Sequence, residues 1–86
     1  MRIKPLPEAV TRTPFSERQQ LMQSVVNETL HRRSICPVGE YVAGPRAPRV
    51  GVYHDNNGWY VKSNFDEPQL ERLGFEAICN MRSYNE

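Results

Sequence analysis

The sequence predicts an α+β fold in which one long amino-terminal helix packs on a small, mainly antiparallel sheet of three to four strands, with a short second helix before the last strand. Three observations predict it: an apolar stripe at helical spacing over residues 21–30, two β-rich arms around an Asn-Asn-Gly turn at residues 50–62, and a period of two over residues 75–82. A chain of 86 residues buries one modest core. We therefore expect residues 1–14 to form a proline-containing arm and residues 15–86 a single small α+β domain.

The arm contains three prolines, Pro5, Pro7 and Pro14. Each removes a main-chain donor and favours extended geometry in the residue before it, so we expect an extended segment rather than a helix. The apolar residues of the arm are Ile3, Leu6 and Val10. They can dock on the domain or on a partner, and the sequence does not choose between the two.

The first helix is expected to run from Pro14 to about Arg33. Thr13 can cap it, with Pro14 at the first helical position, or Ser16 and Gln19 can form a capping box one step later. Its apolar face consists of Leu21, Met22, Val25, Val26, Thr29 and Leu30. Its solvent face is expected to carry Arg18, Gln20, Gln23, Asn27 and Glu28.

Residues 35–42 contain strand-forming side chains interrupted by Pro37 and Gly39, which favours a short irregular edge strand. The following GPRAPR, residues 44–49, is expected to be an exposed, stiff connection. Its prolines cannot donate to a strand ladder, so this stretch separates the edge strand from the next pair of strands.

Residues 50–62, VGVYHDNNGWYVK, carry the clearest local signal, a β-hairpin that turns at Asn57 and Gly58. Because side chains alternate along a strand, the valines and the tryptophan of the two arms share one face. If that face packs against the first helix, Tyr53, Tyr60 and Lys62 emerge together on the other face.

The second helix is expected to begin at Asp66 or Glu67, just before Pro68, and to end near Gly74. Beyond the glycine, the period of two over residues 75–82 favours a last strand. The alternative is a continued helix with one apolar face. That face would consist of Leu70, Leu73, Ala77, Ile78 and Met81.

Charge is unevenly distributed, although the formal net charge is only +1. Basic residues outnumber acidic ones by nine to five up to Ser63 and are outnumbered two to five from Asn64 onward. This asymmetry can orient a partner, but it is far from the dense positive charge of a nonspecific nucleic-acid binder. No run is long and apolar enough to cross a bilayer, and the opening MRIKPLPEAV lacks the apolar run of a secretory signal, so we expect a cytoplasmic protein without membrane contact. In that compartment Cys36 and Cys79 are expected to be reduced and buried.

Residues that can carry chemistry are few and scattered. The four zinc-ligand types are present as His31, Cys36, His54 and Cys79, but their separations match no compact zinc motif. A nucleophilic pair of Cys36 and His54 would have neither an oxyanion site nor an enclosing cleft, and the sequence has no glycine-rich phosphate loop. We therefore expect no enzymatic activity, no cofactor and no metal.

The residues best suited to bind a partner are Arg46, Arg49, Tyr53, Tyr60 and Lys62. Aromatic side chains flanked by cations occur in protein interfaces and in modules that stack nucleobases. They can equally form a cross-strand pair that only covers the sheet. The hairpin resembles the small DNA-binding sheets of AP2-type and integrase arm-binding domains, in which two strands meet at a polar turn and an aromatic follows the glycine. The resemblance covers residues 50–62, after which those families continue with a third strand and this chain with a helix.

These observations favour a small non-enzymatic binding module, of the bacterial or phage regulator or inhibitor type, that docks an exposed sheet face or edge on another protein. The alternative is a DNA- or RNA-binding regulator that uses the same basic aromatic hairpin. A homodimer formed through the last strand is a further expectation, because a strand at a sheet edge can pair with a neighbouring copy.

Overall fold

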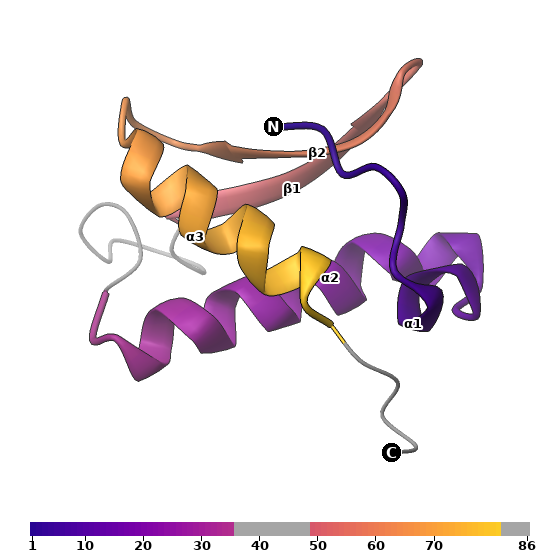
Figure 1. Ribbon diagram of the computed structural model, residues 1–86, viewed down its shortest axis with the longest axis horizontal. Helices are drawn as coiled ribbons and strands as arrows, with labels where there is room; N and C mark the ends of the chain where they lie inside the picture. The colour runs from indigo at the N-terminus through magenta and orange to yellow at the C-terminus, as the bar shows by residue number, and fades with distance from the viewer. Residues whose placement is uncertain (36–48, 82–86) are drawn as a thin grey trace, which may run out of the picture.

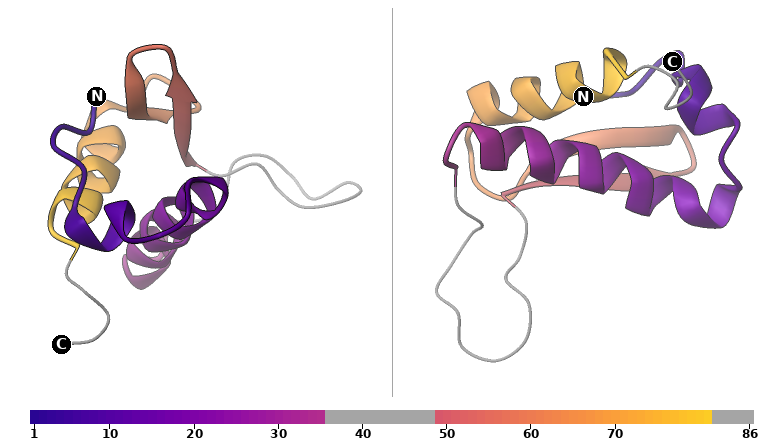
Figure 2. Two further views of the ribbon diagram at one scale, coloured as in Figure 1. Left: turned by 90° about the vertical axis from the view of Figure 1, so that its right-hand side faces the viewer. Right: turned by 90° about the horizontal axis from the view of Figure 1, so that it is seen from below.

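The computed structural model describes residues 1–35 and 49–81. In chain order the elements are α1 (Glu8–Thr11), α2 (Phe15–Arg32), β1 (Val50–Asp55), β2 (Gly58–Ser63) and α3 (Pro68–Cys79). The hairpin β1–β2 forms one layer, and α2 and α3 pack side by side in a second layer beneath it (Figures 1 and 2). The α+β class is confirmed, but the sheet of the described residues has two strands and not three to four. The strand expected within residues 35–42 and the connection at residues 44–49 fall almost entirely outside the described residues.

Helix α2 confirms the first predicted helix and turns its apolar face to the hairpin. The buried residues of this face are Met22, Val26 and Leu30. They share one side because a spacing of four residues returns to the same face of a helix. The start of the helix differs from the prediction, since Pro14 occupies the N-cap position and no side chain caps it. The Thr13 hydroxyl instead donates to the carbonyl oxygen of Ala9 at 2.8 Å, which ties α2 to α1. Residues 8–11 are thus helical where an extended arm was expected.

The predicted hairpin is confirmed, with Asp55 paired to Gly58 and the turn made by Asn56 and Asn57. The turn therefore lies one residue earlier than expected. Gly58 has a φ of 108°, whereas Asn57 does not have a positive φ. The Asp55 carboxylate accepts a hydrogen bond from the Asn57 main-chain nitrogen at 2.8 Å. This bond favours a turn here, and the glycine supplies the φ that returns the chain to β2.

Helix α3 begins after Glu67, as predicted, but it continues through Gly74 to Cys79. The strand expected over residues 75–82 is therefore wrong, and the alternative of a continued helix is correct. Gly74 is buried because α3 passes close to the hairpin and to α2. A Cβ at this position would lie 2.9 Å from Val50 Cγ1 and 3.3 Å from Val26 Cγ1. The glycine permits close packing instead of ending the helix. Because residues 75–79 are helical, the homodimer expected through a last strand loses its structural basis.

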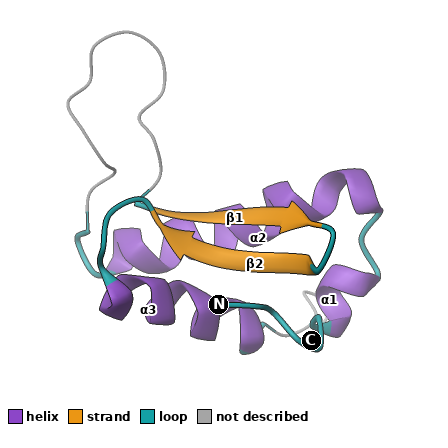
Figure 3. Ribbon diagram, turned by 90° about the horizontal axis from the view of Figure 1, so that it is seen from above, coloured by secondary structure: helices purple, strands orange, loops and turns teal. Residues whose placement is uncertain are grey.

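The first three residues, here named the strap (Met1–Ile3), run antiparallel to β2 along its outer edge. The Val61 nitrogen donates to the Met1 carbonyl oxygen at 2.8 Å, and the Ile3 nitrogen donates to that of Trp59 at 3.0 Å. Figure 3 shows the amino terminus beside β2. Ile3 is only 3% exposed, so its side chain docks on the domain.

One core lies between the hairpin and the helices. Its buried residues are Ile3, Val10, Met22, Val26, Leu30, Val50, Val52, Trp59, Val61 and Ile78. Every described helix and strand contributes to this core, and so does the strap. Cys79 was expected to be buried but is exposed at the end of α3, and Cys36 lies outside the described residues.

Candidate functional site

The face of the hairpin that points away from α2 and α3, here named the open face, carries three of the predicted binding residues. Tyr53 and Tyr60 are direct partners across the strands, with ring centroids 5.6 Å apart and planes tilted by 36°. Tyr53 is 39% exposed, Tyr60 is half-buried, and Lys62 is exposed two residues further along β2. The valines and the tryptophan of the hairpin are buried on the opposite face. The predicted separation of a dry side from a tyrosine side is confirmed.

Tyr53 is held in one orientation by its neighbours. Its ring lies over Gly51, where any Cβ would collide with the phenol group. Its hydroxyl donates to the side-chain oxygen of Asn64 at 3.2 Å. A glycine within the strand thus leaves room for the ring to lie along the sheet. These two contacts favour one orientation of the Tyr53 ring.

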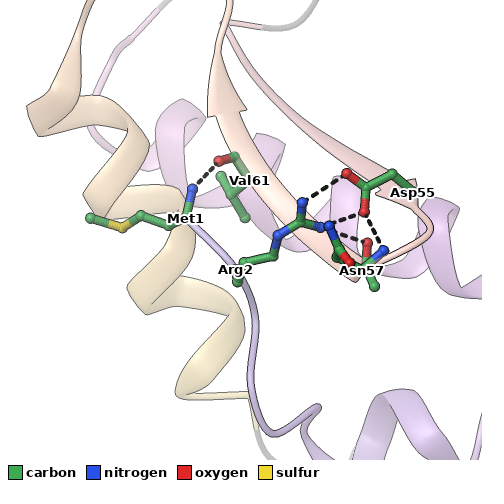
Figure 4. A network of polar contacts seen from close by, with 6 residues as sticks. Met1, Arg2, Asp55, Asn57 and Val61 are labelled. Carbon is green, nitrogen blue, oxygen red and sulfur yellow. Dashed lines mark hydrogen bonds and ion pairs between the residues drawn. The ribbon is translucent and has the colours of Figure 1, made fainter.

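Arg2 of the strap completes the open face, and sequence reasoning missed it. Its guanidinium lies 4.9 Å from the Tyr60 ring centroid and pairs with both carboxylate oxygens of Asp55, at 2.5 and 2.8 Å (Figure 4). It also donates to the Gly58 carbonyl oxygen at 3.2 Å. The hydrogen bond from Arg2, and a weaker contribution from the main chain of Asn57, lower the pKa of Asp55 from 3.8 to about 2. The alternation of apolar, basic and apolar residues at the start of the chain is the signal that indicates a short strand.

Arg49, another predicted binding residue, serves a different contact at the base of the hairpin. Its guanidinium pairs with both carboxylate oxygens of Glu67, at 3.0 and 3.1 Å. It also lies 5.9 Å from the Phe65 ring centroid. Arg49 therefore links the start of β1 to the start of α3. Arg46 lies outside the described residues.

A shallow hollow on the open face lies between the tyrosines and the end of β2. Its lining consists of Tyr53, Tyr60, Lys62, Ser63 and Asn64. Among residues 1–35 and 49–81, the Lys62 ammonium makes no ion pair. A planar or apolar group of a partner can stack on the rings while an acidic group meets Lys62.

The two outer edges of the hairpin are covered in different ways. The edge of β2 is paired with the main chain of the strap. The edge of β1 is covered by side chains of α2: Gln23 Nε2 donates to Val50 O at 2.8 Å, and Gln23 Oε1 accepts from Val52 N at 2.9 Å. Gln19 Nε2 donates to Val52 O at 3.3 Å. A primary amide offers the donor and acceptor of a peptide group, so Gln23, expected on the solvent face, takes the place of a neighbouring strand.

The described residues hold no group of three or more His, Cys, Asp or Glu side chains that could bind a metal ion. The His54 ring packs against Phe15 and Trp59, with centroids 5.2 and 4.7 Å away. Partial desolvation, and to a lesser extent Glu76, raise the pKa of the Cys79 thiol. A raised pKa lowers the thiolate fraction, so this thiol is not activated as a nucleophile.

Comparison with protein-family models, with curated protein sequences and with solved structures finds no match for this chain. Among the helices that the structure describes, none is long and apolar enough to span a membrane. The functional proposal therefore rests on the α+β fold, on the open face and on the covered edges of the hairpin.

Proposed function

We propose that this protein is a small non-enzymatic binding module that docks the open face of its hairpin on another protein, as a regulator or inhibitor of the bacterial or phage type that works in the cytoplasm. The observation that supports it is the ordered pair of Tyr53 and Tyr60 on a sheet face that no described helix covers (Figure 1). Tyrosine and arginine are enriched at interface hot spots because they bury a large area and form directed hydrogen bonds. Arg2 and Lys62 border the pair and supply the charged rim.

The contacts that orient the two tyrosines support binding over a merely covering role. A cross-strand pair that only shields the sheet gains from packing alone. Here Tyr53 is held by Gly51 and Asn64, and Tyr60 lies against Arg2. Side chains that are ordered before binding lose little entropy when a partner docks. We expect Tyr53→Ala to weaken binding by about 2 kcal/mol or more.

The test is photocrosslinking in a lysate of the native host. p-Benzoylphenylalanine replaces Tyr53, which keeps an aromatic ring on the open face. In a matched chain it replaces Gln20, an exposed residue of α2. Irradiation should give an adduct from position 53 that is sensitive to protease and resistant to nuclease, and no adduct of the same mass from position 20.

Competition separates a specific partner from chance contact. Excess wild-type protein should suppress the adduct, and excess Tyr60→Ala protein should suppress it less. Equal adducts from positions 53 and 20, or no adduct from position 53, would contradict the proposal. The tyrosine pair would then only cover the sheet.

A nucleic-acid function is a second proposal, supported by the cations Arg2 and Lys62 beside the two rings. Asp55 already neutralises Arg2, and Glu67 neutralises Arg49, so of the predicted basic residues that the structure describes, Lys62 is left for phosphates. One or two phosphate contacts would give a log–log dependence of affinity on salt with a slope of about −1 to −2. Retention on a polynucleotide column with that slope, reduced by Lys62→Ala, would identify nucleic acid as the partner. If the protein were not retained on the column, the nucleic-acid function would be ruled out.

A further inference from the structure

The layer of helices extends beyond the described strands on the side of β1. Packed helices lie about 8–10 Å apart and paired strands about 4.8 Å apart, so two helices side by side cover about four strands. In this protein α3 lies beneath β2 and the strap, and α2 lies beneath β1 (Figure 2). The strap, β2 and β1 occupy consecutive positions of this sheet layer. A further strand beside β1 would therefore pack on α2.

The main chain of β1 shows where such a strand would pair. Alternate residues of a strand direct their main-chain groups to the same side, so the outward groups belong to Val50, Val52 and His54. Gln23 and Gln19 bind those of the two valines. Within the described residues, no partner is present for the outward N–H and C=O of His54. Unpaired main-chain groups at a sheet edge are a template for strand addition.

Exposed aromatic side chains flank this edge on both faces of the sheet. Phe15, at the start of α2, is 57% exposed and its ring centroid lies 5.2 Å from that of His54. Tyr53, on the open face, is 39% exposed. A strand paired with β1 would direct alternate side chains to these two faces. Apolar side chains of an extended segment would therefore cover both aromatic surfaces.

We propose that the edge of β1 is a docking site for an extended segment of another protein, and that Gln23 and Gln19 rotate away when this segment binds. The inference rests on the proposed function and names the form in which the partner is held. Glutamine side chains rotate without any refolding. The edge of β2 differs from that of β1. A segment could pair with β2 only after the strap had left this edge and exposed Ile3, which is buried.

A second copy of this chain does not fit the site in the antiparallel arrangement. Two copies that paired their β1 edges antiparallel would have both α2 helices on the same face of the joined sheet, about one strand spacing apart, about 4.8 Å. Packed helices need about 8–10 Å. A lone extended segment meets no such collision, because it brings no helix of its own to the layer that α2 already fills.

The test uses the isotope-labelled full chain and a short capped peptide with apolar residues at successive positions, so that both faces of the added strand are apolar, and a lysine at each end for solubility. In an NMR titration this peptide should shift the amide signals of Val52 and His54 and slow their hydrogen exchange. The matched control is the same peptide with N-methyl groups on the amides that face β1, and it should not bind. A simple apolar contact with Phe15 or Tyr53 would tolerate the N-methyl groups.

Two glutamine variants measure the competition at the edge. Gln23→Ala should bind the peptide about fivefold more tightly, because two hydrogen bonds that compete with the incoming strand are removed. Gln20→Ala changes an exposed residue of the same helix and should bind like the wild type. Equal affinities of Gln23→Ala and the wild type would show that the glutamines do not cover the docking edge.

Three other results would overturn the inference: equal binding of the N-methylated peptide, shifts confined to Trp59 and Val61, or dimer formation by Gln23→Ala. The failure of this inference can be told apart from the failure of the proposed function. A specific crosslink from position 53, combined with unshifted Val52 and His54 signals, would mean that the partner uses the open face alone. Strand addition would then be wrong and the binding function would stand.

Discussion

Three hydrogen bonds cover each edge of the hairpin. The two edges differ in whether the covering segment also buries an apolar side chain. On β2 the bonds belong to the main chain of the strap, and Ile3 carries the strap into the core with only 3% of its surface exposed. On β1 the bonds belong to the side chains of Gln19 and Gln23. The comparison teaches that the apolar surface buried by a covering segment, more than the number of its hydrogen bonds, decides whether an edge can open by itself.

The largest expected effect breaks the closure of β2. Ile3→Ala removes a buried side chain and should lower the free energy of unfolding by about 2–5 kcal/mol, as measured by urea denaturation. Hydrogen exchange of the Val61 amide should accelerate, because its bond to Met1 depends on the strap. Lys4→Ala, an exposed neighbour, should change stability by less than about 0.5 kcal/mol. A loss smaller than that of Gln23→Ala would reverse the comparison between the two edges.

The next effect concerns the close packing of α3 against the hairpin and α2 at Gly74. Gly74→Ala places a Cβ 2.9 Å from Val50 Cγ1 and should cost about 1–3 kcal/mol through overpacking. Thermal or urea denaturation measures it. The double variant Gly74→Ala, Val50→Ala removes the colliding methyl group and should be less destabilised than the sum of the two single variants. Strict additivity would mean that the two residues do not approach as closely as described.

A smaller effect is expected from the hydrogen bonds of Gln23 at the β1 edge. Gln23→Ala removes two hydrogen bonds at a partly exposed edge and an exposed one to Asn27, and it should lower the free energy of unfolding by about 1 kcal/mol. Hydrogen exchange should accelerate at Val52 and remain unchanged at Val61, which reports on the opposite edge. Gln20→Ala serves as the control. Acceleration at both amides would show that the two edges open together.

The smallest effect is electrostatic, because the pair of Arg2 and Asp55 is exposed. The pKa of Asp55 is lowered in the folded protein from 3.8 to about 2, so the carboxylate stabilises the fold at a pH above about 4. That contribution disappears as the pH falls from about 4 to about 2. The difference in Tm between the wild type and Asp55→Asn should therefore be present at pH 6 and vanish toward pH 2. A constant difference would mean that the pair does not titrate as described.

Local signals were sufficient for much of the fold. Helix α2, the hairpin and the start of α3 follow from spacing, alternation and the placement of Pro68, which involve residues close in sequence. The end of α3 was predicted wrongly because Gly74 can mark a helix end or a close contact. Only its neighbours Val50 and Val26, which are distant in sequence, decide between these two roles.

The candidate site divides along the same line. Alternation alone placed Tyr53, Tyr60 and Lys62 on one face. Arg2 was missed because its partner Asp55 lies 53 residues away. Gln23 was assigned to solvent because its partners in β1 lie 27 and 29 residues later in the sequence. The available signal is a row of amides spaced by four residues beside the apolar face of α2: Gln19, Gln23 and Asn27.

The position of the strap also determines when it can become ordered during synthesis of the chain. The main chain of Met1 pairs with Val61, 60 residues later in the chain. A ribosome adds roughly 5–20 residues per second, so Met1 waits for seconds before the strand that receives it has been made. During that interval Ile3 has no strand to pack beside, and the strap becomes ordered only after β2 has been made.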